Sequence, residues 1–330
     1  MAEASDELMH PTGDHPAWSE SYYFNFVDPR NKIAMFTRMG FRPGSGWADA
    51  LHVVYLEGKR VAFTYGRRDI EGDLGAYDGD LNVGHLSINC QAPFKNWKVA
   101  YTGPAQDIVD AAILLTPSKE RPEGWFEPAE LAMNVDFRCT SDPHYAAQGE
   151  HGHFEQSGHV TGEIRLGDEV FKVDGYGVRD KSWGPRDWGA GSQAGSSQPA
   201  DTDGPAPFVN WFSMNFGEAI ALGGSCFREA DGVLRGKGWL LRDNVPVDLD
   251  SVTIATRYAD DSILHESVIL DATTSEGEAI RIEGSVLNVC PTKIPFPGGA
   301  IFVNEGLAEF RWGERTGFGI AEHWHAVRRN

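Results

Sequence analysis

The sequence predicts an antiparallel all-β protein made of many short strands, and three observations support this fold class. Apolar and polar residues alternate with a period of two in several segments, as expected for strands that bury one face. Glycine-containing turn signals separate these segments, and no long segment has the periodicity of a helix. The chain also contains 38 glycines and 11% aromatic residues. Because a closed barrel has no exposed strand edge, we expect the strands to close into barrels.

The strands can be placed along the chain from alternation and turns. Apolar runs or alternation predict strands at 51–56, 131–137, 169–173, 208–216, 220–227, 252–258 and 280–286. In the strand at 208–216, Phe212 and Met214 share one face, and Trp211 lies on the opposite face. Hairpin turns are predicted at 57–59, 166–168 and 230–232. A short apolar run at 111–115 has the length of a strand.

Length and charge limit the classes of partner. A chain of 330 residues suits two domains, and 48 acidic against 29 basic residues give a net charge of -19. Such a surface repels phosphate and anionic lipid, so we expect no nucleic acid and no membrane partner. The acidic N-terminus lacks a secretory signal and no apolar run reaches membrane-spanning length, which predicts a cytoplasmic protein. The cysteines lack metal-clip or redox spacing and are expected to be reduced: Cys90, Cys139, Cys226 and Cys290.

One segment, 189–207, interrupts the strand pattern. It consists almost entirely of Gly, Ser, Gln, Ala, Asp, Thr and Pro. This composition is typical of a flexible interdomain linker, and a loop of this length can also serve as a mobile lid. Either interpretation divides the chain into an N-terminal domain at 1–188 and a C-terminal domain at 208–330.

The densest group of charged and aromatic residues lies at 174–188. In an extended strand, Asp180 shares a face with Tyr176, whereas Arg179 and Trp183 lie on the other face. We expect Asp180 to point into a barrel while its basic neighbours point away, so that burial raises its pKa. A carboxyl group that acts as an acid near neutral pH needs such a shift. The alternative is a structural network of arginine and aspartate that fixes the end of the strand.

The same segment carries a resemblance to a known family. The string GYGVRDKSWGPRDW at 175–188 resembles the signature of the hydroxyneurosporene synthase (carotenoid 1,2-hydratase)-like superfamily. The segments 22–69 and 303–327 are similar to an uncharacterised bacterial two-part branch of that group. The resemblance implies two tandem lipocalin-like antiparallel β-barrels and no organic cofactor. It also implies hydrophobic small-molecule ligands, with hydration, cyclisation or elimination carried out by placed acids and bases.

A second group of candidate residues lies at 38–52, where Gly44 and Gly46 indicate a loop that leads into a strand. Loops at barrel mouths often form binding sites. Asp49 or His52 is therefore a candidate proton-transfer partner of Asp180. Alternatively, Asp49 caps the turn and His52 points outward from the strand.

A His-x-His pattern occurs twice, at 151–153 and 323–325. In a strand, both imidazoles of such a pair lie on the same face, as in some β-barrel metal sites. Spacing supplies no third ligand, so we favour no metal site. We expect His323 or His325 to face a cavity or to close the end of a strand. Trp47, Trp183, Trp188 and Trp211 lie near the motifs and can line an apolar pocket.

Together these patterns predict a cofactor-independent lyase or hydratase that acts on a hydrophobic aromatic or terpenoid small molecule. It would add or remove water, or eliminate a small aldehyde. Asp180 is the expected proton donor or acceptor, and Asp49, His52 or His323 would supply the complementary step. The expected substrate-binding residues are Trp47, Tyr176, Arg179, Trp183, Arg186, Trp211 and His325.

Two other classes of function fit the same sequence. A lipocalin-like carrier would need the barrel and an apolar cavity but few polar groups inside it. A metal-dependent barrel enzyme would use His323 and His325 as ligands. The sequence is compatible with a homo-oligomer and does not identify the oligomeric state.

Overall fold

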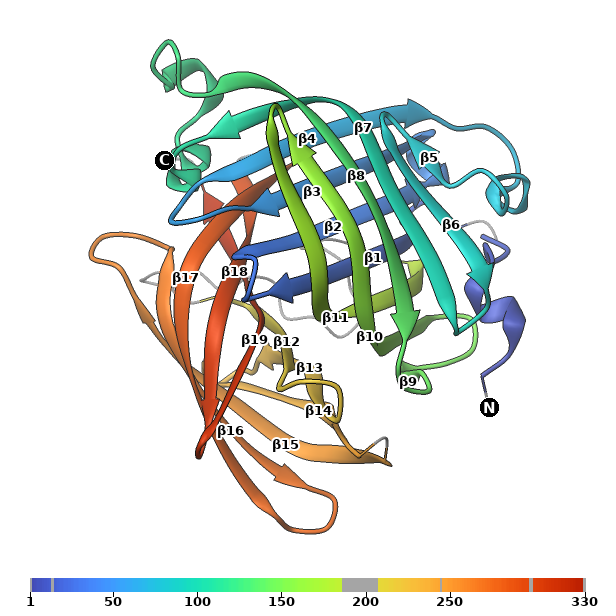
Figure 1. Cartoon of the computed structure of the whole chain (residues 1–330). Coiled ribbons are helices and arrows are strands. Elements are labelled where there is room, and N and C mark those ends of the chain that lie inside the picture. The colour runs from blue at the N-terminus through green and yellow to red at the C-terminus, as the bar shows by residue number, and fades with distance from the viewer. Residues whose placement is uncertain (1, 13–14, 186–206, 244, 297–298, 329–330) are drawn as a thin grey trace. The chain divides into compact units, whose positions relative to one another are not determined.

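The computed structural model describes the chain except for residues 1, 13–14, 186–206, 244, 297–298 and 329–330 (Figure 1). The described residues form nineteen strands and five short 3₁₀ helices. The alternation correctly predicts that strands predominate. The strands of the N-terminal half are β1 (Trp18–Asp28), β2 (Ile33–Arg42), β3 (Trp47–Tyr55), β4 (Val61–Asp69), β5 (Asn82–Val83), β6 (Leu86–Ala92), β7 (Asn96–Ile108), β8 (Glu127–Cys139), β9 (His144–Ala147), β10 (Gly152–Leu166) and β11 (Glu169–Pro185). Those of the C-terminal half are β12 (Val209–Asn215), β13 (Ile220–Arg228), β14 (Leu234–Arg242), β15 (Val245–Tyr258), β16 (His265–Thr274), β17 (Ala279–Phe296), β18 (Gly299–Trp312) and β19 (Arg315–Arg328). The 3₁₀ helices are η1 (Ala4–Glu7), η2 (Pro43–Ser45), η3 (Leu74–Tyr77), η4 (Ala111–Leu115) and η5 (Ser118–Glu120).

The chain divides into two compact units. Unit 1 comprises Met1–Val109 and Phe126–Arg186, and unit 2 comprises Asp110–Trp125 and Asp187–Asn330. The apolar run at 111–115, which has the length of a strand, forms the 3₁₀ helix η4 instead and packs against β17 within unit 2. Asp110 caps this helix by accepting a hydrogen bond from the amide of Ala112, and that turn leaves no extended backbone for sheet pairing.

Unit 1 is an antiparallel barrel. Its strands follow the order β4-β3-β2-β1-β11-β10-β8-β7-β6-β5, and β9 pairs with β10. The barrel closes because the end of β7, at Gln106–Ile108, pairs with β4. The first half of β7 pairs with β6 instead. Closure leaves β4 and β7 without a free edge along this stretch.

Unit 2 is a closed antiparallel barrel in which β12 to β19 follow one another in sequence order and β19 returns to β12. Each unit is therefore one lipocalin-like barrel, and the chain has the tandem architecture that the resemblance implies. The predicted hairpin turns lie between β3 and β4, between β10 and β11, and between β13 and β14. Gly58, Gly167 and Gly232 in these turns have positive φ, a backbone conformation that glycine adopts without strain.

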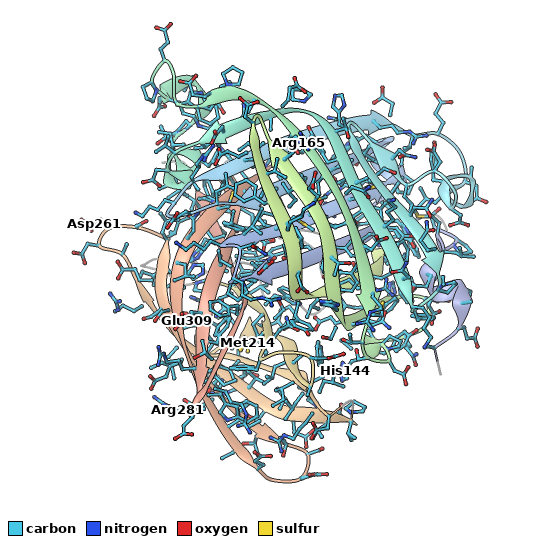
Figure 2. The ribbon with its side chains drawn as sticks, viewed as in Figure 1. His144, Arg165, Met214, Asp261, Arg281 and Glu309 are labelled. Atoms are coloured by element: carbon cyan, nitrogen blue, oxygen red, sulfur yellow. The ribbon has the colours of Figure 1, made fainter. Side chains whose placement is uncertain are left out.

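Alternation places one face of each strand in a core. In β12, Phe212 and Met214 belong to the core of unit 2, as predicted, and Trp211 lies on the opposite face. Figure 2 shows the outer side of the same barrel, where Arg281 of β17 projects from the strand and pairs with Asp271. Among the described residues, no helix is both long and apolar enough to cross a membrane.

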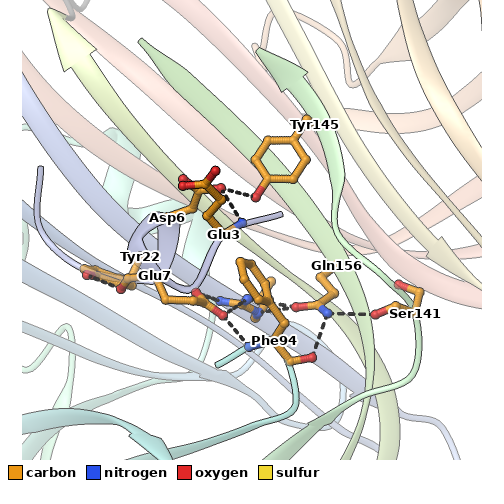
Figure 3. A network of polar contacts seen from close by, with 9 residues as sticks. Glu3, Asp6, Glu7, Tyr22, Phe94, Ser141, Tyr145 and Gln156 are labelled. Carbon is orange, nitrogen blue, oxygen red and sulfur yellow. Dashed lines mark hydrogen bonds and ion pairs between the residues drawn. The ribbon is translucent and has the colours of Figure 1, made fainter. Parts of the chain in front are cut away.

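The interior of unit 1 contains a buried ionic network as well as an apolar core. Arg179 of β11 donates to both carboxylate oxygens of Glu7, at 3.0 and 2.5 Å, and to Gln156. Figure 3 shows how η1 brings Glu7 to Phe94, whose amide donates to the same carboxylate. Lys181 forms a second buried ion pair, with Glu20. The N-terminal segment is thus part of the interior of this barrel.

Candidate active site

A row of polar side chains crosses the interior of the unit 2 barrel. Asn210 of β12 lies opposite Cys226 of β13 and opposite His323 of β19. On the far side of β19, His323 lies opposite Asn304 of β18. Residues directly opposite in an antiparallel pair point to the same face, and Cys226 belongs to the core. Cys226, Asn210, His323 and Asn304, the polar row, therefore all face the barrel interior.

Two further strands add polar groups to this row. Thr256 of β15 forms a hydrogen bond through Oγ1 with Nε2 of His323, at 3.0 Å. The His265 ring of β16 lies against the His323 ring, with the ring centroids 3.9 Å apart. Tyr258 also contacts His323, with a centroid distance of 6.0 Å. Three groups capable of proton transfer therefore meet inside one barrel.

One ring of the cluster has a defined tautomer. His265 Nε2 lies 2.8 Å from the carbonyl oxygen of Ala321 and must donate to it. In a neutral imidazole the other nitrogen is then an acceptor, so Nδ1 of His265 presents a lone pair. Gly306 makes room for this ring, because a Cβ at that position would lie 2.1 Å from His265 Nε2.

Several polar atoms of the cluster are buried without a hydrogen-bond partner. They are Nδ1 of His265, Nδ1 of His323, Oδ1 of Asn304 and both amide atoms of Asn210. The histidines and asparagines among these residues are at most 2% exposed. Each such atom costs about 1–3 kcal/mol if it stays unpaired. A cluster of this kind is typical of a site that a ligand completes.

Burial determines the protonation states. It lowers the pKa of His265 to about 3, and, with the neighbouring imidazoles His265 and His325, it holds the pKa of His323 well below its usual value. Burial also raises the pKa of Tyr258 above its usual value and that of Cys226 to about 12. At neutral pH the two imidazoles are therefore unprotonated bases, and the phenol and the thiol keep their protons.

The cluster adjoins a small apolar cavity of about 10 Å³, close to the space that one water molecule needs. Met214, Leu270 and other apolar side chains line it beside Asn210 and His323. No group of three His, Cys, Asp or Glu side chains with a geometry suited to a metal ion occurs in the described part of the chain.

The structure corrects the predicted orientation of Asp180. The two faces of β11 are assigned as predicted, but the inward face is the basic one: Arg179 and Lys181 are fully buried, and Trp183 belongs to the core of unit 1. Asp180 and Tyr176 lie on the other face and are half-buried. The inward orientation failed because Glu7 and Glu20 neutralise the two cations inside the barrel, a pairing that local sequence does not reveal.

Asp49 also lies outside the barrel interior. Its carboxylate accepts hydrogen bonds from Arg38, at 3.2 Å, and from Arg42, at 2.6 Å. Two cations lie over the Trp47 ring, with Arg42 at 4.5 Å and Arg67 at 4.4 Å from its centroid. This is an ion-paired cluster on the outer face of β2–β4.

His52, by contrast, lies inside the unit 1 barrel, so the alternative in which it points outward from the strand is wrong. Its ring stacks on Tyr101 at 5.3 Å, and neither ring nitrogen has a hydrogen-bond partner. Burial lowers its pKa to about 3. His52 therefore points into the barrel, whereas Asp49 and Asp180 lie on the outward faces of their strands.

The remaining predicted residues fall in different places. Trp183 stacks on His10 inside unit 1 and donates to the carbonyl of Gly149. Trp211 lies on the outer face of β12, whereas His325 faces the interior of unit 2 with His323. Arg186, Trp188 and nearly all of the predicted linker or lid at 189–207 lie outside the described residues.

Sequence reasoning missed Asn210, Thr256, Tyr258, His265 and Asn304 as site residues. A signal for three of them was present. Asn210 has the parity of Phe212 and Met214, and Thr256 and Tyr258 have the parity of Val252. A polar residue at an inward position of an apolar strand is the feature that could have identified them.

Comparisons with known proteins agree with this architecture. A family model described as "Domain of unknown function (DUF7064)" matches residues 3–327. An AttH candidate from Nitrosomonas europaea is similar in structure, with 12% identity, a TM-score of 0.60, and coverage of 100% of this chain and 97% of that chain. Kievitone hydratase from Nectria haematococca has 9% identity, a TM-score of 0.55, and coverage of 100% and 94%. CghA with Sch210972 has 11% identity, a TM-score of 0.53, and coverage of 95% and 89%.

At these identities the likeness shows the fold. A comparison of the sequence with curated proteins finds no match. The more specific resemblance to the hydroxyneurosporene synthase-like superfamily stays a prediction.

Proposed function

The chain belongs to this family of unknown function, and we propose that it is a cofactor-independent lyase or hydratase that acts on a hydrophobic small molecule. The observation that carries the proposal is the meeting of His323, His265 and Tyr258 inside the apolar barrel of unit 2. The name of kievitone hydratase, one of the proteins with a similar fold, supports hydration or dehydration as the reaction class.

The polar cluster favours an enzyme over a carrier. A carrier of hydrophobic ligands needs few polar groups in its cavity, whereas proton transfer needs at least two within reach of the ligand. Several unpaired polar atoms in an apolar core lower the stability of the fold. Such destabilising groups are found at functional sites, where they take part in catalysis.

In the proposed dehydration, His323 is the base. Its neutral imidazole takes a proton from a carbon next to an electron-withdrawing group and passes that proton to the departing hydroxyl. One C–H bond and one C–O bond break, a carbon–carbon double bond forms, and the hydroxyl leaves as water. Tyr258, which stays protonated, donates a hydrogen bond to the oxygen on which negative charge develops. Hydration follows the same steps in reverse.

The other predicted catalytic residues have a weaker position in this proposal. Asp180 and Asp49 face away from the barrel interiors, and Asp49 is held by two arginines. His52 belongs to unit 1, and the polar row belongs to unit 2. Catalytic roles for these three residues stay predictions, and Asp180 loses the inward orientation on which its role was based.

The test is the substitution His323→Asn. We expect turnover of a hydroxylated aromatic or terpenoid substrate, followed by mass spectrometry as the gain or loss of one water, to fall by about 10²–10⁴-fold. His153→Asn, on the outer face of β10, is the matched control and should keep wild-type turnover. A substrate that is bound but never changes in mass would contradict the enzymatic proposal and favour the carrier.

A further inference from the structure

Two unpartnered atoms of the cluster around His323 are fixed as hydrogen-bond acceptors. His265 Nδ1 is an acceptor because Nε2 donates to Ala321, and Asn304 Oδ1 is an acceptor because its amide nitrogen donates to the carbonyl of Ile263 at 2.9 Å. Asn210 adds one further acceptor, Oδ1, and the two N–H donors of Nδ2. A ligand that completes this set must therefore bring O–H or N–H donors of its own.

The charged groups near the polar row bear on whether it can bind an anion. None of its four residues carries a permanent charge, and the nearby carboxylate of Glu322 lies on the outer face of β19, where Trp324 Nε1 donates to it. Arg228 of β13 donates to the carbonyl of Pro207, at 2.9 and 2.5 Å, and its charge also acts on Tyr258. A carboxylate ion offers acceptor oxygens only, so it cannot pair with the fixed acceptors of the cluster and would be desolvated there, which is costly. The low pKa of the His265 and His323 rings also disfavours the imidazolium that would pair with it.

We infer that the interior of unit 2 binds the hydroxylated end of an uncharged apolar molecule, and that carboxylates are rejected. The ligand's hydroxyl groups donate to His265 Nδ1, Asn304 Oδ1 and Asn210 Oδ1, and one of its oxygens accepts from Asn210 Nδ2. The inference rests on the proposed function in taking this interior as the substrate site, and it names the substrate class. A hydroxylated substrate is also what the removal of water requires.

Entry of the ligand requires side-chain movement, because the free space beside the row is about 10 Å³. Met214 lines this space, and its unbranched, flexible side chain can move aside at little cost. Compact probes are therefore the appropriate test ligands.

The test compares three benzene derivatives of similar size. They are catechol, which has two hydroxyl donors, 1,2-dimethoxybenzene, which has acceptors only, and benzoate, which is an anion. Binding to the full-length protein is measured by ligand-observed NMR and calorimetry. We expect catechol to bind at least about tenfold more tightly than the other two, as the loss of one to two hydrogen bonds implies.

The variant Asn210→Leu locates the effect. It keeps the size of the side chain and removes polar atoms that have no partner in the protein, so the fold should become more stable rather than less. Its preference for catechol should fall by about three- to tenfold. Asn288→Leu is the matched control, since Asn288 is also a buried asparagine but pairs with Leu307 on the outer face of the barrel, and it should keep the preference.

The results separate the two proposals. Equal binding of catechol and its dimethyl ether, tightest binding of benzoate, or no binding of any probe overturns the inference, whatever the turnover of the His323 variant. A preference for catechol that Asn210→Leu weakens supports the inference, and it does so even if no turnover is found.

Discussion

At the scale of single residues, Arg179 shows how strongly a partner determines the position of a charged side chain. Its guanidinium is fully buried between the rings of Trp97 and Phe154, each about 5.1 Å away, and it pairs with both carboxylate oxygens of Glu7. The geometry satisfies both ions, and removal of either one would leave the other buried without compensation.

We predict that Glu7→Gln lowers the free energy of unfolding by about 3–5 kcal/mol, because Arg179 loses its counter-ion in a buried site. Urea denaturation measures the change. The double variant Glu7→Met/Arg179→Met should recover most of the loss. The exposed pair of Arg281 and Asp271 provides the control, and Asp271→Asn should cost less than about 1 kcal/mol. A loss for Glu7→Gln as small as that of the control would contradict the prediction.

At the scale of elements, β11 carries the motif that is most characteristic of the sequence, and close approach to β1 explains its glycines. A Cβ on Gly177 would lie 1.7 Å from the carbonyl oxygen of Asn25. Next to it, the Asn25 side chain accepts a hydrogen bond from the amide of Val178 at 3.0 Å. The Gly-Tyr-Gly part of the motif thus serves the packing of two strands, and the phosphate-binding role of other glycine-rich motifs does not apply.

We predict that Gly177→Ala destabilises the protein by about 1–3 kcal/mol, since β1 and β11 must separate locally to admit the methyl group. Thermal and urea unfolding measure the effect. Gly79→Ala is the control, because a Cβ at Gly79 meets no atom within 4 Å. Similar stability for the two variants would show that the β1–β11 contact is less rigid than the structure indicates.

At the scale of the whole molecule, both barrels bury neutral histidines. The pKa of His52 in unit 1 and that of His265 in unit 2 are each lowered to about 3 by burial. The unfolded chain takes up protons at these positions below about pH 6.5, whereas the folded chain does so only near pH 3. Stability from this source is complete above pH 6.5 and is lost as the pH falls towards 3.

We predict that the free energy of unfolding falls by about 1.4 kcal/mol per pH unit for each of these histidines between pH 6 and pH 4. Urea titrations across this range test the slope. His52→Phe keeps the stacking on Tyr101 and should reduce the slope by about one histidine's share. His15→Phe, at an exposed position, should leave it unchanged. An unaltered slope in His52→Phe would show that His52 takes up its proton in the folded protein.

The alternation of side chains predicts much of the fold and part of the site. It identifies the strand of Val252–Tyr258, the two faces of β11, and the shared face of His323 and His325. It also predicts that Phe212 and Met214 are buried. These features depend on the period of two in an extended chain, which is a local property of the backbone.

The sequence by itself determined an all-β chain with charged residues gathered in β11, and it indicated that His323 or His325 faces a cavity or closes the end of a strand. Tertiary structure alone decided that Arg179 and not Asp180 is inside, because the neutralising Glu7 lies 172 positions away in the chain. It also decided that Asn210, His265 and Asn304 join His323, because barrel closure aligns β12, β16, β18 and β19. The alternation along a strand is a local property of the sequence. The ion-pair partner of a side chain, and the other residues of its site, come from strands that only folding brings together.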